Sequence, residues 1–227
     1  ANQAAAHKAL LADIGGGIFT RERPVFRGDL DAPVMNIQTE SDTFSILSSW
    51  RVRQPDTDTF RLWEIAGTAH ADRHLLGPAA DMIDCTAPIN DGPAHLVAKA
   101  ALRALDTWVR TGAVPPVAER IPLSDSANNP VPLRDADGIA LGGVRTPPVD
   151  VPVDALSGVP VSSSIICLLL GSTVALPDTR IAELYSSRTE YEQLYEESAV
   201  ATIAAGFVLE DDHSALTAYS QPARVAP

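Results

Sequence analysis

The chain has 227 residues, enough for one domain with a substantial core, and its composition (45% hydrophobic, 20% charged) is typical of a globular protein. A formal net charge of -12 argues against a nucleic-acid-binding surface, which needs clustered lysine and arginine, and against docking on an anionic membrane. No apolar run approaches the roughly 20 residues of a membrane-spanning helix. The longest run, residues 165–170, predicts a buried strand or a helical turn.

The first residues of the chain and its two cysteines each leave alternatives open. The chain begins Ala1-Asn2-Gln3, without methionine and without the charged-then-apolar leader of a signal peptide. We therefore expect a processed product, a fragment or an incomplete chain whose address tag would lie upstream. We expect a soluble protein whose compartment stays open, with a preference for a secreted or periplasmic location. Cys85 and Cys167 are compatible with one disulfide or with two separate buried thiols.

The first predicted elements are a helix and two strands. Residues 1–12 favour a helix by composition, and the glycines at 15–17 end it. The short β-branched segment 34–38 predicts a strand. Residues 60–66 alternate between apolar and polar side chains and predict a second strand, which Gly67 ends.

The strongest predicted helix covers residues 93–111. Asp91 can cap it, and Pro93 suits its first turn. Its apolar side chains lie three or four residues apart, so we expect them to form one buried stripe. The stripe contains Val97, Ala101, Ala104, Leu105 and Trp108. We also expect Trp63, in the middle of the second strand, to pack in the core.

The second half of the chain is less regular until its end. Residues 117–164 are rich in proline, glycine, aspartate and valine, which predicts an extended segment with short strands that wraps over the domain. Within it, residues 135–138 predict a turn; a calcium loop would need a later glutamate, which is absent. Helices are predicted over 178–185 and 188–205, and a short one over 210–219.

Candidate catalytic residues follow the two predicted strands. Glu40 and Asp42 come after the first strand, and His70 comes after the second. Acyl-transfer hydrolases need a base that takes a proton from the nucleophile and a carboxylate that orients this base. We therefore expect His70 to lie just past a parallel strand, within hydrogen-bond reach of Asp42 or Glu40. The alternatives are a structural loop histidine and, for the acid that is not used, a cap on a helix starting near Thr43.

Two motifs, Thr39-Glu40-Ser41-Asp42 and Thr68-Ala69-His70, lie in stretches that resemble an α/β-hydrolase-domain family. The resembling stretches are residues 33–42, 60–72, 88–93, 142–147 and 170–173. The resemblance runs from about residue 27 to the end of the chain. It implies an α/β fold with a parallel sheet flanked by helices, a Ser–acid–His triad and esterase-like chemistry. In this fold the chain order is serine, acid, histidine, which places the nucleophile upstream.

The sequence departs from a complete family member because it has no Gly-x-Ser-x-Gly nucleophile motif. The nearest serines, Ser157 and Ser172, follow His70, which is the wrong order for this fold. We therefore expect the C-terminal half of a serine-type hydrolase, inactive alone, whose partner is an N-terminal half carrying the serine. The substrate is expected to be a small ester or an amide. The alternative is a non-catalytic binding or structural module of the same fold.

The resemblance also divides the chain. The expected parts are an N-terminal helical segment (1–26), the C-terminal half of the hydrolase core (27–116), the wrapping segment (117–164) and a helical C-terminal segment of the same domain (165–227). We expect no cofactor, because no Gly-x-Gly-x-x-Gly follows a strand. We expect no metal, because no further histidine or cysteine is grouped with His70, Asp72 and His74. The interface with the N-terminal half should bury Val34, Ile37, Leu62 and Ile65.

Overall fold

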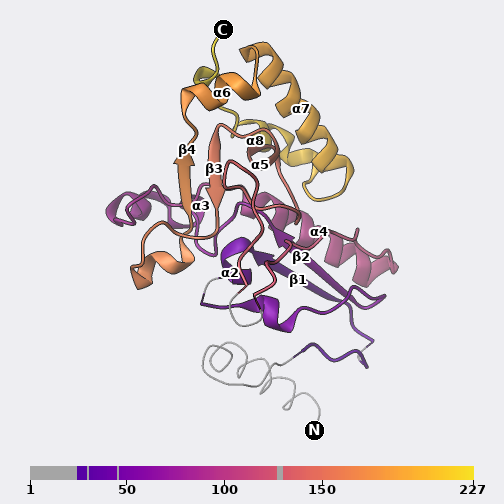
Figure 1. Cartoon of the computed structure of the whole chain (residues 1–227). Coiled ribbons are helices and arrows are strands. Elements are labelled where there is room, and N and C mark those ends of the chain that lie inside the picture. Colours follow the sequence, from indigo (N-terminus) through magenta and orange to yellow (C-terminus); the bar gives the residue numbers. More distant parts are fainter. Residues whose placement is uncertain (1–24, 30, 45, 127–129) are drawn as a thin grey trace.

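A computed structural model describes residues 25–29, 31–44, 46–126 and 130–227. The helix predicted over residues 1–12, the glycines at 15–17 and most of the predicted segment 1–26 lie outside this part of the chain. The predicted strands are present as β1 (Val34–Thr39) and β2 (Phe60–Ile65). They pair in parallel, with Val34 opposite Phe60 and Thr39 opposite Ile65 (Figure 1). Both strands therefore end at the same edge of the sheet.

The two strands differ in burial. All six residues of β2 are buried, whereas all six of β1 are only half-buried. On the side away from β1, the Ala66 N–H donates to the Val144 carbonyl at 3.0 Å, and the Val144 N–H donates to the Glu64 carbonyl at 2.7 Å. Thus β2 is the inner strand, and β1 pairs with no second strand among the described residues.

The predicted long helix is α4 (Ala94–Thr111), and it packs on the sheet. Its buried residues are Leu96, Val97, Ala100, Ala101 and Trp108. The first four belong to one core cluster with Trp63 and Ile65 of β2. Trp63 and Trp108 are both buried, as predicted. The predicted Asp91 cap is wrong: Pro93 occupies the N-cap position and no side chain caps the helix. Asp91 lies too early in the loop and is exposed.

The second half adds a smaller sheet and the remaining helices. After α5 (Pro147–Asp150), β3 (Asp154–Ser157) pairs antiparallel with β4 (Ser172–Ala175). The C-terminal helices are α6 (Asp178–Leu184), α7 (Arg188–Ala204) and α8 (His213–Thr217). In Figure 1, α6 and α7 lie at the top and the β1–β2 sheet lies toward the bottom. Strand β4 was not predicted, because four residues carry too little periodicity.

Short helices occupy the connections between these elements. They are α2 (Glu40–Phe44), α3 (Arg73–Leu76) and the 3₁₀ helices Ser49–Val52, Gly77–Met82, Ile165–Leu169, Glu210–Asp212 and Pro222–Arg224. The predicted turn at 135–138 lies where Arg134 pairs antiparallel with Ala140. None of the described helices combines the length and the apolar composition that crossing a membrane requires.

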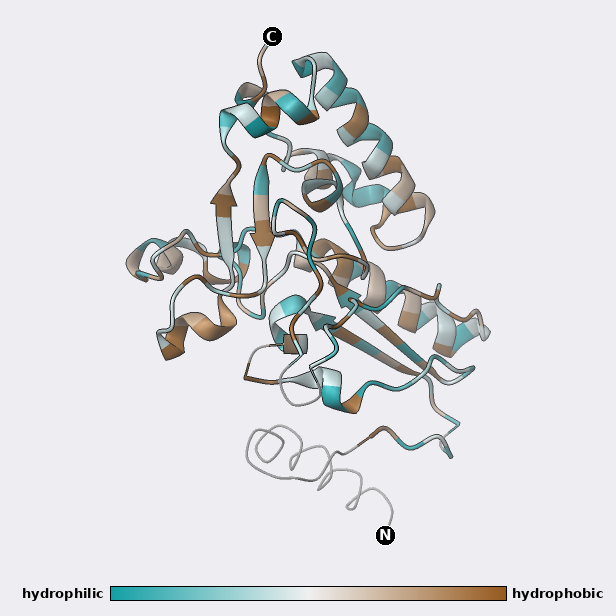
Figure 2. Ribbon diagram, in the orientation of Figure 1, coloured by the Kyte–Doolittle hydropathy of each residue, from teal (hydrophilic) through white to brown (hydrophobic). Residues whose placement is uncertain are grey.

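Cys85 and Cys167 form a disulfide, with their Cα atoms 5.6 Å apart, which settles the alternative left open by the sequence. Cys167 belongs to the 3₁₀ helix Ile165–Leu169, so the apolar run 165–170 is largely a helical turn. The predicted burial holds for only part of it. Cys167 is buried, but Ile165 is 81% exposed and Ile166 58% exposed. Figure 2 shows this hydrophobic helix at the periphery of the molecule, in brown.

Candidate active site

The acid turn begins where β1 ends. Thr39 is the last residue of β1, and Asp42 lies in the first turn of α2. One carboxylate oxygen of Asp42, Oδ2, accepts hydrogen bonds from the Thr39 backbone N–H at 2.8 Å and from the Thr39 hydroxyl at 2.7 Å. The carboxylate is therefore held on one side, and its other oxygen is available to a second partner.

That second partner is His70. Its Nδ1 lies 2.7 Å from Asp42 Oδ1, the contact expected from the sequence. The Asp42 side chain is largely buried, whereas the His70 side chain is 49% exposed. The hydrogen bond to Asp42, together with the attraction of its charge, raises the pKa of His70, although partial burial acts against this. The ring is thus oriented through Nδ1, while much of it faces outward.

The acid turn and the histidine loop are bonded residue by residue. Glu40 Oε2 accepts a hydrogen bond from the Gly67 N–H at 2.8 Å. The Ser41 N–H donates to the Thr68 carbonyl at 3.4 Å, and the His70 N–H donates to Ser41 Oγ at 2.6 Å. Together with the contact of Asp42, these bonds fix the backbone of the histidine loop against the acid turn.

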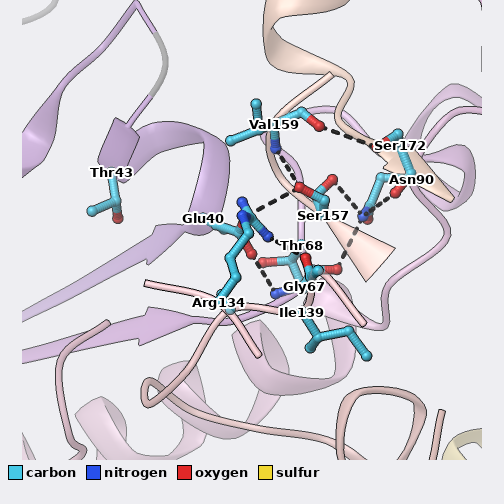
Figure 3. Close-up of polar contacts among 12 residues, drawn as sticks. Glu40, Thr43, Gly67, Thr68, Asn90, Arg134, Ile139, Ser157, Val159 and Ser172 are labelled. Atoms are coloured by element: carbon cyan, nitrogen blue, oxygen red, sulfur yellow. Dashed lines mark hydrogen bonds and ion pairs between the residues drawn. The ribbon is translucent and has the colours of Figure 1, made fainter. Parts of the chain in front are cut away.

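Glu40, the other carboxylate considered from the sequence, is fully buried and pairs with Arg134. Figure 3 shows the same carboxylate in contact with Ser157, whose Oγ lies 3.3 Å from Glu40 Oε1. It makes no hydrogen bond to His70. Nor does Glu40 cap a helix near Thr43, because α2 begins at Glu40 itself. Of the two acids, the structure brings Asp42 to the histidine.

Asn90 is a residue of this region that the sequence did not single out. It is fully buried, and its Nδ2 donates to the carbonyls of Gly67 at 3.0 Å and Ser157 at 3.1 Å (Figure 3). Its Oδ1 accepts from the Gly92 N–H at 2.9 Å. An asparagine before Asp-Gly is typical of an ordinary turn, so no local sequence pattern predicted these contacts of Asn90.

Gly158 brings β3 close to the same two loops. A Cβ at this position would lie 2.6 Å from the Glu40 Cβ and 2.6 Å from the Thr68 carbonyl oxygen. Neither distance leaves room for a side chain. The backbone after β3 therefore packs directly against the turn and the loop that carry Asp42 and His70.

The serines that follow His70 in the chain do not bond to its ring. Ser157 Oγ contacts Glu40, and Ser172 Oγ donates to the Val159 carbonyl at 3.1 Å. Among the residues that the structure describes, none forms a hydrogen bond with Nε2 of His70. The hydrogen bond of the His70 ring that the structure shows is therefore the one to Asp42.

A pair of stacked histidines lies outside the Asp42–His70 contact. The rings of His74, in α3, and His95, in α4, stack at 3.6 Å between centroids and 4° between planes. Burial and the neighbouring His74 lower the pKa of His95. Flat stacking does not direct ring nitrogens toward a common point. Within the described ranges, no three histidine, cysteine, aspartate or glutamate side chains are grouped to hold a metal ion.

Comparison with known proteins identifies a family for this chain. The sequence profile of a family described as an alpha/beta hydrolase domain matches residues 2–218. Searches of the curated proteins and of the solved structures gave no match. The match covers the parallel strands, the two loops beyond them and nearly all of the helices.

Proposed function

Because the chain belongs to the alpha/beta hydrolase domain family, we propose that Asp42 and His70 are the acid and the base of a serine-type hydrolase. The observation that carries the proposal is the 2.7 Å contact between His70 Nδ1 and Asp42 Oδ1. It joins two loops at the carboxyl ends of neighbouring parallel strands, where ligands bind in open α/β sheets. The substrate is a small ester or an amide, cleaved through an acyl-enzyme.

In this proposal each ring nitrogen of the histidine has its own role. Asp42 accepts a hydrogen bond from the Nδ1–H of His70, which leaves Nε2 as the acceptor of the nucleophile's proton. When Nε2 is protonated, the carboxylate of Asp42 stabilises the positive ring. Nε2 then returns the proton to the leaving group. The raised pKa of His70 supports this assignment, since a stronger base takes the proton more readily.

The nucleophile, in this proposal, is a serine of an upstream part of the same hydrolase. Among the described residues β1 pairs only with β2, which supports such a partner, because a strand placed at the other edge of β1 would satisfy its backbone groups. The interface expected from the sequence needs one correction. Leu62 and Ile65 are already buried inside this chain, so only the half-buried Val34 and Ile37 remain to be covered.

The proposal is tested by the variant His70→Ala in the intact protein, meaning this chain together with the proposed serine-carrying part. The substrate is a generic aryl ester. We expect turnover to fall on the order of a hundredfold or more, with folding retained, because the base is lost. His213→Ala is the matched control, since His213 also pairs with a carboxylate, Glu196, at 2.8 Å. Near-normal turnover in His70→Ala would remove His70 from the mechanism.

A second measurement separates catalysis from a non-catalytic module of the same fold. A serine-directed phosphonate should label the intact protein and require His70 for rapid labelling. If the intact protein neither hydrolyses aryl esters nor reacts with the phosphonate, the non-catalytic alternative replaces this proposal.

A further inference from the structure

Glu40 is a fully buried carboxylate beside the candidate dyad that the proposed mechanism does not use. We propose that Glu40 is a positioning residue: its carboxylate fixes the loop that carries His70, and Arg134 and Ser157 hold that carboxylate in place. The inference rests on the proposed function of His70. It concerns a residue that acts on the histidine loop without touching His70 or a substrate.

The first step is the bond from the histidine loop. Gly67 follows β2 and has a positive φ of 67°, a conformation that other residues rarely adopt. Its N–H donates to Glu40 Oε2 at 2.8 Å. A Cβ at Gly67 would lie 2.6 Å from Val149 Cγ2, so the backbone is confined on its other side as well. Because His70 follows three residues later, a rotation at Gly67 moves the ring relative to Asp42.

The second step is the anchoring of the carboxylate itself. Oε1 of Glu40 pairs with Arg134 Nη2 and lies 3.3 Å from Ser157 Oγ. Arg134 is fixed in turn, because its Nη1 donates to the Gly138 carbonyl at 2.8 Å. In Figure 3 the side chains of Arg134 and Ser157 reach Glu40 from separate segments of the chain. Glu40 therefore joins the ends of β1 and β2 to the 134–140 turn and to β3.

The chain contains a matched control in Glu64. This glutamate is also fully buried, and it accepts hydrogen bonds from Arg53 Nε at 2.5 Å and Nη2 at 2.6 Å. It also accepts one from a backbone amide, the Ile121 N–H, at 2.9 Å. The two glutamates have the same chemistry, but no hydrogen bond of the Glu64 carboxylate reaches residues 40–42 or 67–70.

The experiment compares Glu40→Gln with Glu64→Gln in the intact protein. Glutamine keeps the shape but turns one NH₂ toward a donor, either the backbone N–H or the arginine. We expect both variants to lose thermal stability. Only Glu40→Gln should also move the NMR titration of the His70 ring to lower pH and reduce kcat for an aryl ester roughly ten- to a hundredfold, with KM little changed. His70→Gln assigns the resonance.

A second matched pair covers the case in which Glu40→Gln does not fold. Arg134→Met removes the anchor of Glu40, and Arg53→Met removes that of Glu64. Arg134→Met should shift the His70 titration in the same direction, and Arg53→Met should leave it in place. An unchanged His70 titration in the Glu40 and Arg134 variants overturns the inference, as does an equal shift in the Glu64 and Arg53 variants.

The titration is measured without substrate, so the two proposals fail separately. If His70→Ala retains turnover but Glu40→Gln shifts the His70 titration, the positioning role stands and the proposed function falls. If wild-type turnover depends on His70 but Glu40→Gln changes neither the titration nor kcat, the proposed function stands and the positioning role falls.

Discussion

His70 and His95 have different surroundings, which shift their pKa values in opposite directions. His70 faces a carboxylate, remains half-exposed and has a raised pKa. His95 stacks on another histidine, its Nδ1 is buried without a hydrogen-bond partner, and its pKa is lowered. The pKa of one histidine is therefore raised and that of the other is lowered. The difference comes from the hydrogen bond to Asp42 at His70 and from burial and the neighbouring His74 at His95.

The largest expected effect on turnover comes from removing the charged partner of His70. In Asp42→Asn the partner of Nδ1 loses its charge, and the amide favours the wrong tautomer of the ring. We expect turnover of an aryl ester to fall on the order of a hundredfold or more, as in His70→Ala, with the fold retained. Asp106→Asn is the control, because Asp106 lies in an exposed ion pair with Arg110 on α4. Turnover equal to that of the control would show that the carboxylate does not serve the histidine.

The pH dependence of stability sharpens the comparison. The folded-state pKa of His95 is lowered, so its contribution to stability is present above the unfolded-state pKa of about 6.5 and is lost as the pH falls below it. The folded-state pKa of His70 is raised, so its contribution is present below about 6.5 and is lost as the pH rises through the folded-state pKa.

His95→Phe isolates the first of these contributions. Phenylalanine keeps a flat ring against His74 and forfeits no hydrogen bond at Nδ1, which has none. Urea unfolding at about pH 8 and about pH 5 should show a smaller acid-side loss of stability in the variant than in the wild type. The charged groups that face His95, namely Asp72, Lys99, Asp212 and His74, are unchanged in both proteins. An identical acid-side loss would mean that the stacked pair does not oppose protonation.

The smallest effect on turnover is expected at Thr39, whose side chain bonds to the Asp42 carboxylate. Thr39→Val removes the hydroxyl that donates to Asp42 Oδ2 at 2.7 Å but keeps the backbone donor at 2.8 Å. The same hydroxyl also accepts a hydrogen bond from the Asp42 N–H at 3.3 Å and lies 3.2 Å from Ser41 Oγ. We expect kcat to fall severalfold, because the Asp42 carboxylate loses one of its hydrogen bonds, worth about 1 kcal/mol. Thr39→Ser retains the hydroxyl and should stay close to the wild type. A serine variant as slow as the valine variant would point to packing of the methyl group as the cause.

Local sequence patterns predicted much of the sheet and the dyad. The alternation in residues 60–66 and the β-branched run at 34–38 identified both strands, and the polar residues after them identified Asp42 and His70. These signals are local in the sequence. They locate one site because parallel strands bring their carboxyl ends together at the same edge of the sheet. The choice between Asp42 and Glu40 needed the structure, since Glu40 is drawn away by Arg134, 94 residues later in the chain.

Other features escaped sequence reasoning for the same physical reason. The hydrogen bonds of Asn90 to the Gly67 and Ser157 carbonyls join residues 23 and 67 positions apart, and no local pattern reports such contacts. The Cys85–Cys167 pair spans 82 positions, so composition alone left it undecided. The cap expected at Asp91 failed because the chain turns into α4 only at Pro93.

The most direct test of the account is the pH dependence of kcat/KM for an aryl ester, measured beside the NMR titration of His70 in the same intact protein. The base must be unprotonated, so kcat/KM should rise with pH along the His70 titration, above the ordinary histidine pKa. In Asp42→Asn, both the residual rate profile and the titration should move to lower pH together. A rate profile that rises at a pH unrelated to the His70 titration, or that stays in place while the titration moves, would contradict the assignment of His70 as the base.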